Sequence, residues 1–231
     1  MFFKQFYDNN LSQASYLVGC QRTGEAIIID PVRDLTKYME VADSEGFTIT
    51  QAAETHIHAD FASGIRDVAE QLNANVYVSG EGDDELSYRN MPEQTHFVKH
   101  QDIIHVGNIK LEVLHTPGHT PESISFLLTD EGGGSSVPMG LFSGDFVFVG
   151  DIGRPDLLEK SVQMEGSTEV SAKQMYQSIE SVKDLPDYIQ IWPGHGAGSP
   201  CGKALGAVPM STLGYEKINN WAFSETDETK F

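Results

Sequence analysis

Short apolar blocks separated by turn residues dominate the first half of the chain. The segments FFKQFY (2–7), ASYLVGC (14–20) and EAIIIDP (25–31) are typical of strands, and DNNLSQ joins the first two as a hairpin-like pair. Apolar runs of the same kind predict further strands in the segments 47–55, 75–80, 102–120, 123–130, 139–145 and 188–194. Turns are predicted within 102–120 at Gly107-Asn108 and Pro117-Gly118.

Helical periodicity alternates with these strands. It predicts helices over 34–46, closed by Gly46, and over 61–73, 167–186 and 210–223. The strands come in two batches, each followed by helices, which indicates two mixed sheets sandwiched between helices. We therefore expect an α/β fold of four layers (αββα). The chain 1–231 is expected to be a single domain, with 224–231 as a linker or tail.

Composition narrows the classes of partner. Fifteen basic against 34 acidic residues give a formal charge of −19, which disfavours nucleic acid and anionic membranes as partners. We found no signal peptide and no apolar run near the roughly 20 residues of a membrane span. With only two cysteines, a disulfide scaffold is not expected, and a cytoplasmic location is.

Metal-binding residue types recur at the ends of the predicted strands. Because strand ends gather on one edge of a sheet, residues distant in sequence can meet there. The candidates are His56, His58 and Asp60 in THIHADF, His119 in TPGHT, Asp145 in FSGDF and His195 in WPGHG. Taken singly, Asp60 could be a helix N-cap and Asp145 a turn residue. Their joint occurrence in this order favours a metal site.

The remaining histidines and Cys20 have simpler explanations. A histidine in a loop is usually a solvated or hydrogen-bonded side chain, so we do not assign a site role to the remaining four. They are His96, His100, His105 and His115. Cys20 ends a predicted strand and is expected in the core.

The order of these motifs resembles the metallo-β-lactamase superfamily over nearly the entire chain. The resemblance implies an αββα sandwich with metals at one edge of its sheets. The superfamily motif HxHxDH is matched by HIHADF in five positions, and Phe61 stands in the sixth. By the superfamily pattern Asp60, the missing histidine and His195 would hold a second metal, with Asp145 bridging. Too few donors remain for it, so we expect a single-metal site.

Four strings are similar to one single-iron branch, the persulfide dioxygenases, and most of all to bacterial forms fused to rhodanese domains. They are THIHADFASG, HTPGHTPESISF, FSGDFVFVGDIGRPDL and WPGHGAGSPCGKALG. The resemblance implies one Fe(II) per chain, with zinc as a substitute, held by His56, His119 and Asp145. Two histidines and a carboxylate are typical of non-haem Fe(II) oxygenases, whose remaining positions are open to substrate and O₂. The implied reaction converts a persulfide, O₂ and water into a thiol and sulfite.

Other residues receive supporting roles from the same resemblance. His58, Asp60 and His195 would orient ligands or bound water by hydrogen bonds. Arg154 would anchor an anionic substrate, or else form an ordinary surface salt bridge. Cys201 lies six residues after His195, and it either relays sulfur or is an inert small residue in a turn.

Two rival functions stay open at this point. One is a hydroxyacylglutathione-hydrolase-like thioesterase with two zinc ions, which Phe61 disfavours. The other is a non-catalytic metal-holding or sulfur-carrying module. The expected substrates are O₂ and a persulfide of glutathione, coenzyme A or another thiol carrier. The resemblance also implies a homo-oligomer, and either a rhodanese domain in a full-length protein or a protein that stands alone.

Overall fold

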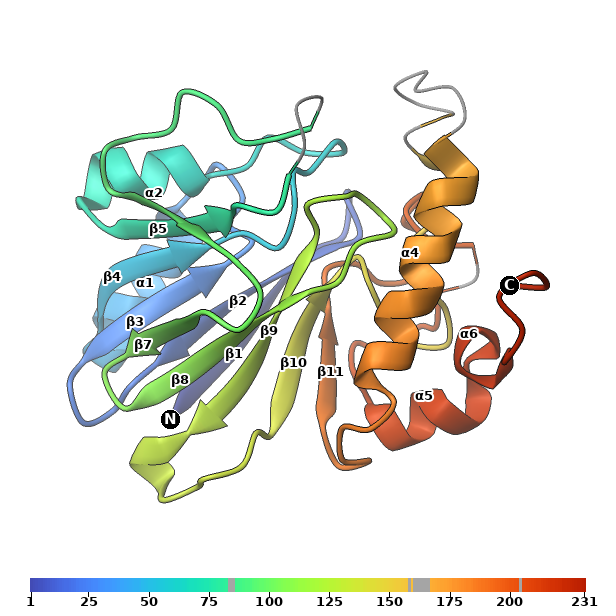
Figure 1. The fold of residues 1–231 in the computed structure, drawn as a ribbon. Coiled ribbons are helices and arrows are strands. Elements are labelled where there is room, and N and C mark those ends of the chain that lie inside the picture. The colour runs from blue at the N-terminus through green and yellow to red at the C-terminus, as the bar shows by residue number, and fades with distance from the viewer. Residues whose placement is uncertain (83–85, 158, 160–166, 204) are drawn as a thin grey trace.

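Two mixed β-sheets packed face to face form the centre of the molecule, and helices cover both outer faces (Figure 1). The computed structural model describes residues 1–82, 86–157, 159, 167–203 and 205–231. The layer order of helices, sheet, sheet and helices confirms the αββα expectation.

The first sheet holds the strands of the N-terminal half in sequence order. Its first two strand pairs are antiparallel and the following three are parallel. The strands are Phe2–Asp8 (β1), Gln13–Gly19 (β2), Glu25–Ile29 (β3), Thr48–Ala53 (β4), Asn75–Ser79 (β5) and Thr95–Val98 (β6).

The second sheet has the order β12-β11-β10-β9-β8-β7. Only β10 and β11 are parallel neighbours in it, and the other pairs are antiparallel. Its strands are Ile103–Val106 (β7), Ile109–His115 (β8), Ile124–Asp130 (β9), Gly140–Gly144 (β10), Gln190–Pro193 (β11) and Ser211–Thr212 (β12).

Helices α1 and α2 lie on the outer face of the first sheet, and α4, α5 and α6 lie on the outer face of the second (Figure 1). Their bounds are Thr36–Glu45 (α1), Ile65–Leu72 (α2), Ser167–Val182 (α4), Leu213–Asn219 (α5) and Trp221–Ser224 (α6), and a 3₁₀ turn, η1, spans Glu131–Gly133. Gly46 ends α1 in the left-handed conformation, as predicted.

The run of isoleucines in β3 shows how one strand serves two cores. Ile27 and Ile29 point between the sheets, where they pack in one cluster with Phe126 and Trp192. Ile28 points the other way, into the cluster beneath α1 and α2. Successive side chains of a strand face opposite sides, so a strand covered on both faces is apolar at every position. Burial of each such side chain stabilises the fold by about 1.5–3 kcal/mol.

Three elements differ from the sequence prediction. The helix predicted over 61–73 begins only at Ile65, so Asp60 is not its N-cap. The helix predicted over 210–223 is divided, because Asn220 is extended and its side chain accepts a hydrogen bond from the Ala222 N–H. Strand β6 was not predicted, since its sequence THFV is short and half exposed.

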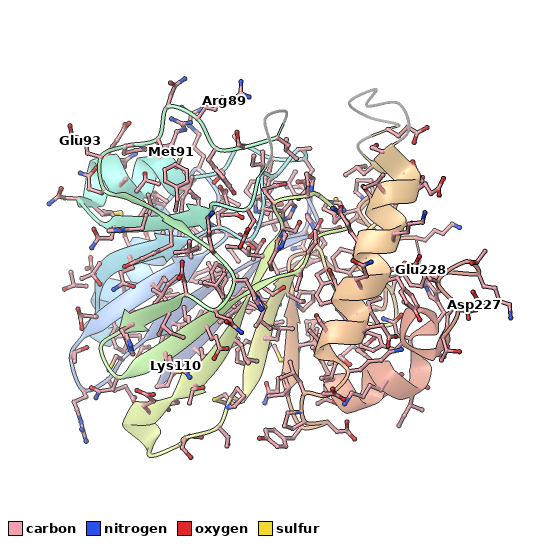
Figure 2. All side chains as sticks on the ribbon, in the orientation of Figure 1. Arg89, Met91, Glu93, Lys110, Asp227 and Glu228 are labelled. Carbon is pink, nitrogen blue, oxygen red and sulfur yellow. The ribbon has the colours of Figure 1, made fainter. Side chains whose placement is uncertain are left out.

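Figure 2 shows the side chains on the ribbon, with several labelled at the periphery of the sandwich. Arg89, Met91 and Glu93 lie on the loop beside α2, whereas Asp227 and Glu228 lie on the C-terminal segment beside α4. That segment folds back, and the Phe231 ring stacks on Trp221 with centroids 5.3 Å apart.

Among the residues described, no helix combines the length and apolar character needed to cross a bilayer.

Candidate metal centre

Two parallel strands bring Asp145 and His195 together. Asp145 follows β10 and His195 comes two residues after β11, and the ladder pairs Gly144 with Pro193. Parallel neighbours end at the same edge of a sheet, so the residues after them lie side by side. His195 Nδ1 and Asp145 Oδ1 are 2.7 Å apart.

Two further histidines that are candidate metal ligands reach this edge from different sheets. His56 follows β4 of the first sheet, and His119 lies in the connection between β8 and β9 of the second. The Ile124 N–H at the start of β9 donates to the carbonyl of Thr55 over 2.8 Å, which joins the two segments directly. The predicted convergence of strand ends therefore occurs across the sandwich.

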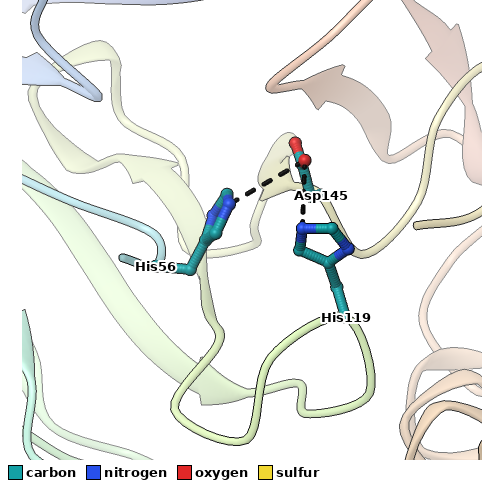
Figure 3. A group of neighbouring side chains, drawn as sticks. All are labelled: His56, His119 and Asp145. Carbon is teal, nitrogen blue, oxygen red and sulfur yellow. Dashed lines mark ion pairs between the residues drawn. The ribbon is translucent and has the colours of Figure 1, made fainter. Parts of the chain in front are cut away.

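His56, His119 and Asp145 form a buried group that could hold a cation (Figure 3). Asp145 Oδ2 lies 3.4 Å from His119 Nε2 and 3.8 Å from His56 Nε2. This oxygen is buried and has no hydrogen-bond partner. An unpaired buried carboxylate oxygen is costly, so its place between two imidazole nitrogens fits a metal ligand set.

Hydrogen bonds assign the tautomers of both histidines. The Thr55 hydroxyl donates to Asp30 Oδ2 over 2.8 Å, so its oxygen accepts from His56 Nδ1 at 3.1 Å. His119 Nδ1 donates to the carbonyl of Arg154 over 3.3 Å. Each ring therefore keeps an Nε2 lone pair aimed at the same point, as metal-bound histidines do.

The charges of the metal-free site support this assignment. Burial, and then the charge of nearby His58, lowers the pKa of His56 well below its usual range, and burial lowers the pKa of His119. Burial would raise the pKa of Asp145, but the charge of His195, together with its hydrogen bond to Asp145, outweighs it and holds that pKa well below normal. The three groups are therefore two neutral imidazoles and one carboxylate, ready to bind a divalent cation.

Two buried carboxylates, which the sequence analysis did not select, hold the segment that carries His56. Asp30 accepts a 2.7 Å hydrogen bond from the Thr55 N–H, and Glu122 accepts a 2.8 Å bond from the Ile57 N–H. Asp30 adopts a left-handed backbone with φ 52°, which is uncommon outside glycine. An acidic residue directly after a buried strand was the available signal for Asp30, and Glu122, three residues after His119, had a weaker one.

His58 lies beside the three-residue group and does not belong to it. Its Nε2 is 3.3 Å from Asp30 Oδ1, and its ring packs against His56 on one side and Phe61 on the other, at 4.2 and 4.4 Å between centroids. Burial would lower the pKa of His58, but the Asp30 charge outweighs it and raises the pKa to about 9. This position suits the supporting role expected for His58.

Asp60 and His195 form a second, adjoining group with Cys201. His195 Nε2 is 2.7 Å from Asp60 Oδ2, and the charges of Asp145 and Asp60 raise the pKa of His195 to about 10 despite its burial. Burial, followed by the charge of Asp145, raises the pKa of the Cys201 thiol. A thiol in that state is a poor nucleophile, so a sulfur relay through Cys201, which stays a prediction, needs a group that removes its proton.

Arg154 serves this edge through its backbone. Its carbonyl orients His119, and its N–H donates to the Cys201 carbonyl over 2.9 Å. The guanidinium forms a two-pronged pair with Asp156 at 2.9 and 3.0 Å. The side chain is thus in the salt bridge that was the simpler alternative, and its role as a substrate anchor stays a prediction.

Two glycines lie directly against Asp145. A Cβ atom on Gly153 would lie 1.8 Å from the Asp145 carbonyl oxygen, and one on Gly194 would lie 2.7 Å from Asp145 Oδ1. Neither position has room for a side chain, because backbone segments meet Asp145 directly.

A helix-covered double sheet with histidine and aspartate side chains on one edge defines a class of metal-dependent enzymes. The chain belongs to the metallo-beta-lactamase superfamily, whose family model matches residues 8–195. This membership confirms the fold and the family expected from the motifs.

Individual relatives place the chain within that superfamily. A crystal structure of a metallo-beta-lactamase from Staphylococcus aureus subsp. aureus COL is 76% identical with a TM-score of 0.94, over 99% of this chain and 65% of the other. ETHE1 from Myxococcus xanthus is 29% identical with a TM-score of 0.78, over 100% of this chain and 88% of the other. A beta-lactamase hydrolase-like protein from Xylella fastidiosa (strain 9a5c) is 26% identical over 98% of this chain. The chain spans 53% of that relative, about half its length.

Proposed function

We propose that this protein is a non-haem Fe(II) persulfide dioxygenase. It would oxidise a low-molecular-weight thiol persulfide with O₂ and water to sulfite and the thiol, as in sulfide detoxification. One observation carries the proposal: two neutral histidines and one unpaired carboxylate oxygen converge on one point, and a phenyl ring packs on the neighbouring His58 where the superfamily motif has a histidine.

His56, His119 and Asp145 would hold the metal. A ferrous ion held by these residues would supply electrons to O₂ and bind the persulfide sulfur. Thr55 and the Arg154 carbonyl fix the two imidazole rings by the hydrogen bonds to their Nδ1 atoms. Asp145 supplies one negative charge, which favours the more oxidised metal.

Apolar groups flank the site. The Phe61 ring covers His58, and the buried Phe148 ring lies 6.3 Å from the His195 ring, edge to face. Apolar rings of this kind suit a soft sulfur atom. A dinuclear hydrolase would instead use a third nitrogen at position 61.

The similarity to ETHE1 from Myxococcus xanthus over the entire chain supports the persulfide dioxygenase branch. Other relatives bear hydrolase names, which keeps a dinuclear zinc thioesterase as the competing function. Persulfides of glutathione, coenzyme A or another thiol carrier are the proposed substrates. A cytoplasmic location, a homo-oligomeric state and a rhodanese domain in a longer polypeptide are further proposals.

Anaerobic reconstitution with iron, followed by oxygen-electrode assays across several persulfides, tests the function. We expect one iron per chain, O₂ uptake and sulfite as the product. Asp145→Ala and His119→Ala should abolish uptake. Thioester hydrolysis under argon without any persulfide-dependent O₂ uptake would establish the thioesterase instead. Full iron loading without uptake on any persulfide would favour a non-catalytic module.

A further inference from the structure

The chain turns back on itself directly after Asp145. Val147 and Ile152 pair as an isolated antiparallel bridge, and Gly150 at the turn between them has a left-handed φ of 79°. We call residues 146–154 the return loop. Its last residues come back to the aspartate after which the loop begins.

The end of the return loop contacts two of the three candidate metal ligands. A Cβ atom on Gly153 would lie 1.8 Å from the Asp145 carbonyl oxygen, so the two backbone segments pack directly on each other. The Arg154 carbonyl accepts the 3.3 Å hydrogen bond from His119 Nδ1. A shift of the return loop would therefore move the acceptor that orients the His119 ring.

Side chains of the C-terminal helices hold the turn of the return loop. Glu216 Oε2 in α5 accepts from the Gly150 N–H and from Asn220 Nδ2, both over 2.9 Å. Asn220 Nδ2 also donates to the Asp151 carbonyl over 2.9 Å. Trp221 Nε1 at the start of α6 donates to Asp151 Oδ1 over 3.0 Å. Three of these four bonds reach the loop itself.

The burial of Glu216 and Asn220 indicates more than helix packing. Both side chains are completely buried, and Oε1 of Glu216 has no hydrogen-bond partner. A buried carboxylate of this kind is costly, and an apolar side chain would pack α5 against the sheet without that cost. What Glu216 and Asn220 add is a fixed position for the backbone of Gly150 and Asp151.

We propose that Glu216 and Asn220 are positioning residues for the metal centre. They act through the return loop on the Arg154 carbonyl, and through that carbonyl on the ring of His119. Without their bonds the loop would take several positions, and His119 Nε2 would point at the metal for only part of the time. The inference rests on the metal site of the proposed function, but not on a persulfide as the substrate.

Cobalt(II) binding measures this effect without persulfide or oxygen. Metal-free protein is titrated anaerobically with Co²⁺ against a competing chelator, and His119→Ala identifies the ion bound at this site. Glu216→Met removes both accepted bonds at similar volume. We expect severalfold weaker Co²⁺ binding, less than the roughly 10- to 100-fold cost of losing a direct partner of a ligand. Glu216→Gln keeps an acceptor oxygen and should recover most of the affinity.

Two further variants separate positioning from the stability of the helices. Asn220→Asp keeps the oxygen that accepts from the Ala222 N–H but loses both donated bonds, and should weaken Co²⁺ binding to a similar extent. Lys217→Met is the matched control, because Lys217 Nζ joins α5 to the Leu185 carbonyl and to Asp187 instead of to the return loop. It should lower the midpoint of thermal unfolding and leave Co²⁺ affinity unchanged.

Nitrogen-15 NMR of histidine-labelled, metal-free protein observes the orienting bond itself. The His119 Nδ1–H should exchange with water at least tenfold faster in Glu216→Met than in the wild type. The His56 Nδ1–H, which is bonded to Thr55 beyond the first sheet, should exchange at the wild-type rate. A general loosening of the fold would accelerate both.

Three results would overturn the positioning role: unchanged Co²⁺ affinity in Glu216→Met, equal acceleration of the two histidine N–H groups, or a wild-type His119 Nδ1–H without protection from exchange. A different result would overturn the metal site, and both proposals with it: wild-type Co²⁺ binding that His119→Ala leaves unchanged. The two failures are thus distinguishable.

Discussion

Asp145 and His195 are joined by a 2.7 Å hydrogen bond between Oδ1 and Nδ1, while the other oxygen of Asp145 faces His119 and His56. The two oxygens of this carboxylate thus make different interactions. One orients an imidazole and the other is available to a metal. This division explains how the two groups of side chains can adjoin without a shared oxygen.

The carboxylate charge of Asp145 should be essential for iron binding. Asp145→Asn keeps the shape but replaces one oxygen by an amide nitrogen that cannot bind a metal. We expect iron affinity to fall at least tenfold and O₂ uptake to approach background, measured by competition with a chelator and an oxygen electrode. Asp227→Asn, on the exposed C-terminal segment, is the matched control and should change neither. Unchanged iron affinity in Asp145→Asn would remove it from the ligand set.

Thr55 should control the tautomer of His56. Thr55→Val removes the oxygen that accepts from His56 Nδ1 and also leaves Asp30 Oδ2 without its donor. We expect metal affinity to fall about 10- to 100-fold, the usual cost of losing such an orienting partner. Thr55→Ser keeps the hydroxyl and should restore most of the affinity. Equal affinities for the valine and serine variants would show that the hydroxyl does not orient His56.

Phe61 should limit occupancy of the second metal position of the superfamily pattern. Phe61→His restores the nitrogen of the superfamily motif and adds a donor beside Asp60. Zinc retained per chain against a competing chelator should rise relative to the wild type. Phe61→Leu, which removes the ring without adding a donor, separates the two effects. No change in Phe61→His would mean that the aromatic ring is not what excludes a metal.

The metal-free protein should lose stability as pH rises. His195 and His58 have folded pKa values of about 10 and about 9, above the roughly 6.5 of an unfolded histidine. Their stabilisation is therefore complete below about pH 6.5 and is lost as pH rises through 9 to 10. Hydrogen bonds outweigh the burial of Cys20 and lower the pKa of its thiol to about 7. Because this folded pKa lies below that of an unfolded cysteine, the Cys20 thiol makes the folded protein more stable as pH rises.

Thermal unfolding from pH 6 to 8 in a Cys20→Ser background tests the histidine effect, because the buried Cys201 thiol, whose pKa is also raised, contributes in the same sense only above about pH 8. The midpoint temperature should fall with pH, and His58→Gln should flatten the slope. His105→Gln changes an exposed histidine and should not. A midpoint that stays level or climbs over this range would contradict the charge assignments.

Arg154 should affect substrate binding more than turnover if its guanidinium group binds the substrate. Arg154→Lys retains the charge but loses the paired geometry. We then expect a severalfold higher KM with kcat little changed. Asp156→Asn frees the guanidinium from its present pair and should lower KM or leave it unchanged. Identical KM values in Arg154→Lys and the wild type would confine Arg154 to its salt bridge.

The strands and the candidate metal ligands were predictable because their signals are local, whereas the choice of His56, His119 and Asp145 as one group came from the family resemblance. The EAIIIDP run predicted a strand, and each of His56, His119 and Asp145 stands near the end of a strand or in a Pro-Gly turn. Local patterns could not reveal Asp30 and Glu122, since their partners Thr55 and Ile57 are 25 and 65 residues away. The division of the last helix depends likewise on Asn220, whose side chain donates to the distant Asp151 carbonyl.

The crowding of glycines around Asp145 bears on how such a protein could lose its chemistry over evolutionary time. Gly153 and Gly194 hold no ligand atom, yet a methyl group at either would displace the aspartate they enclose. A related protein could keep His56, His119 and Asp145 and still be inactive if either glycine were replaced. The residues at these two positions would therefore distinguish active from inactive homologues better than the histidines do.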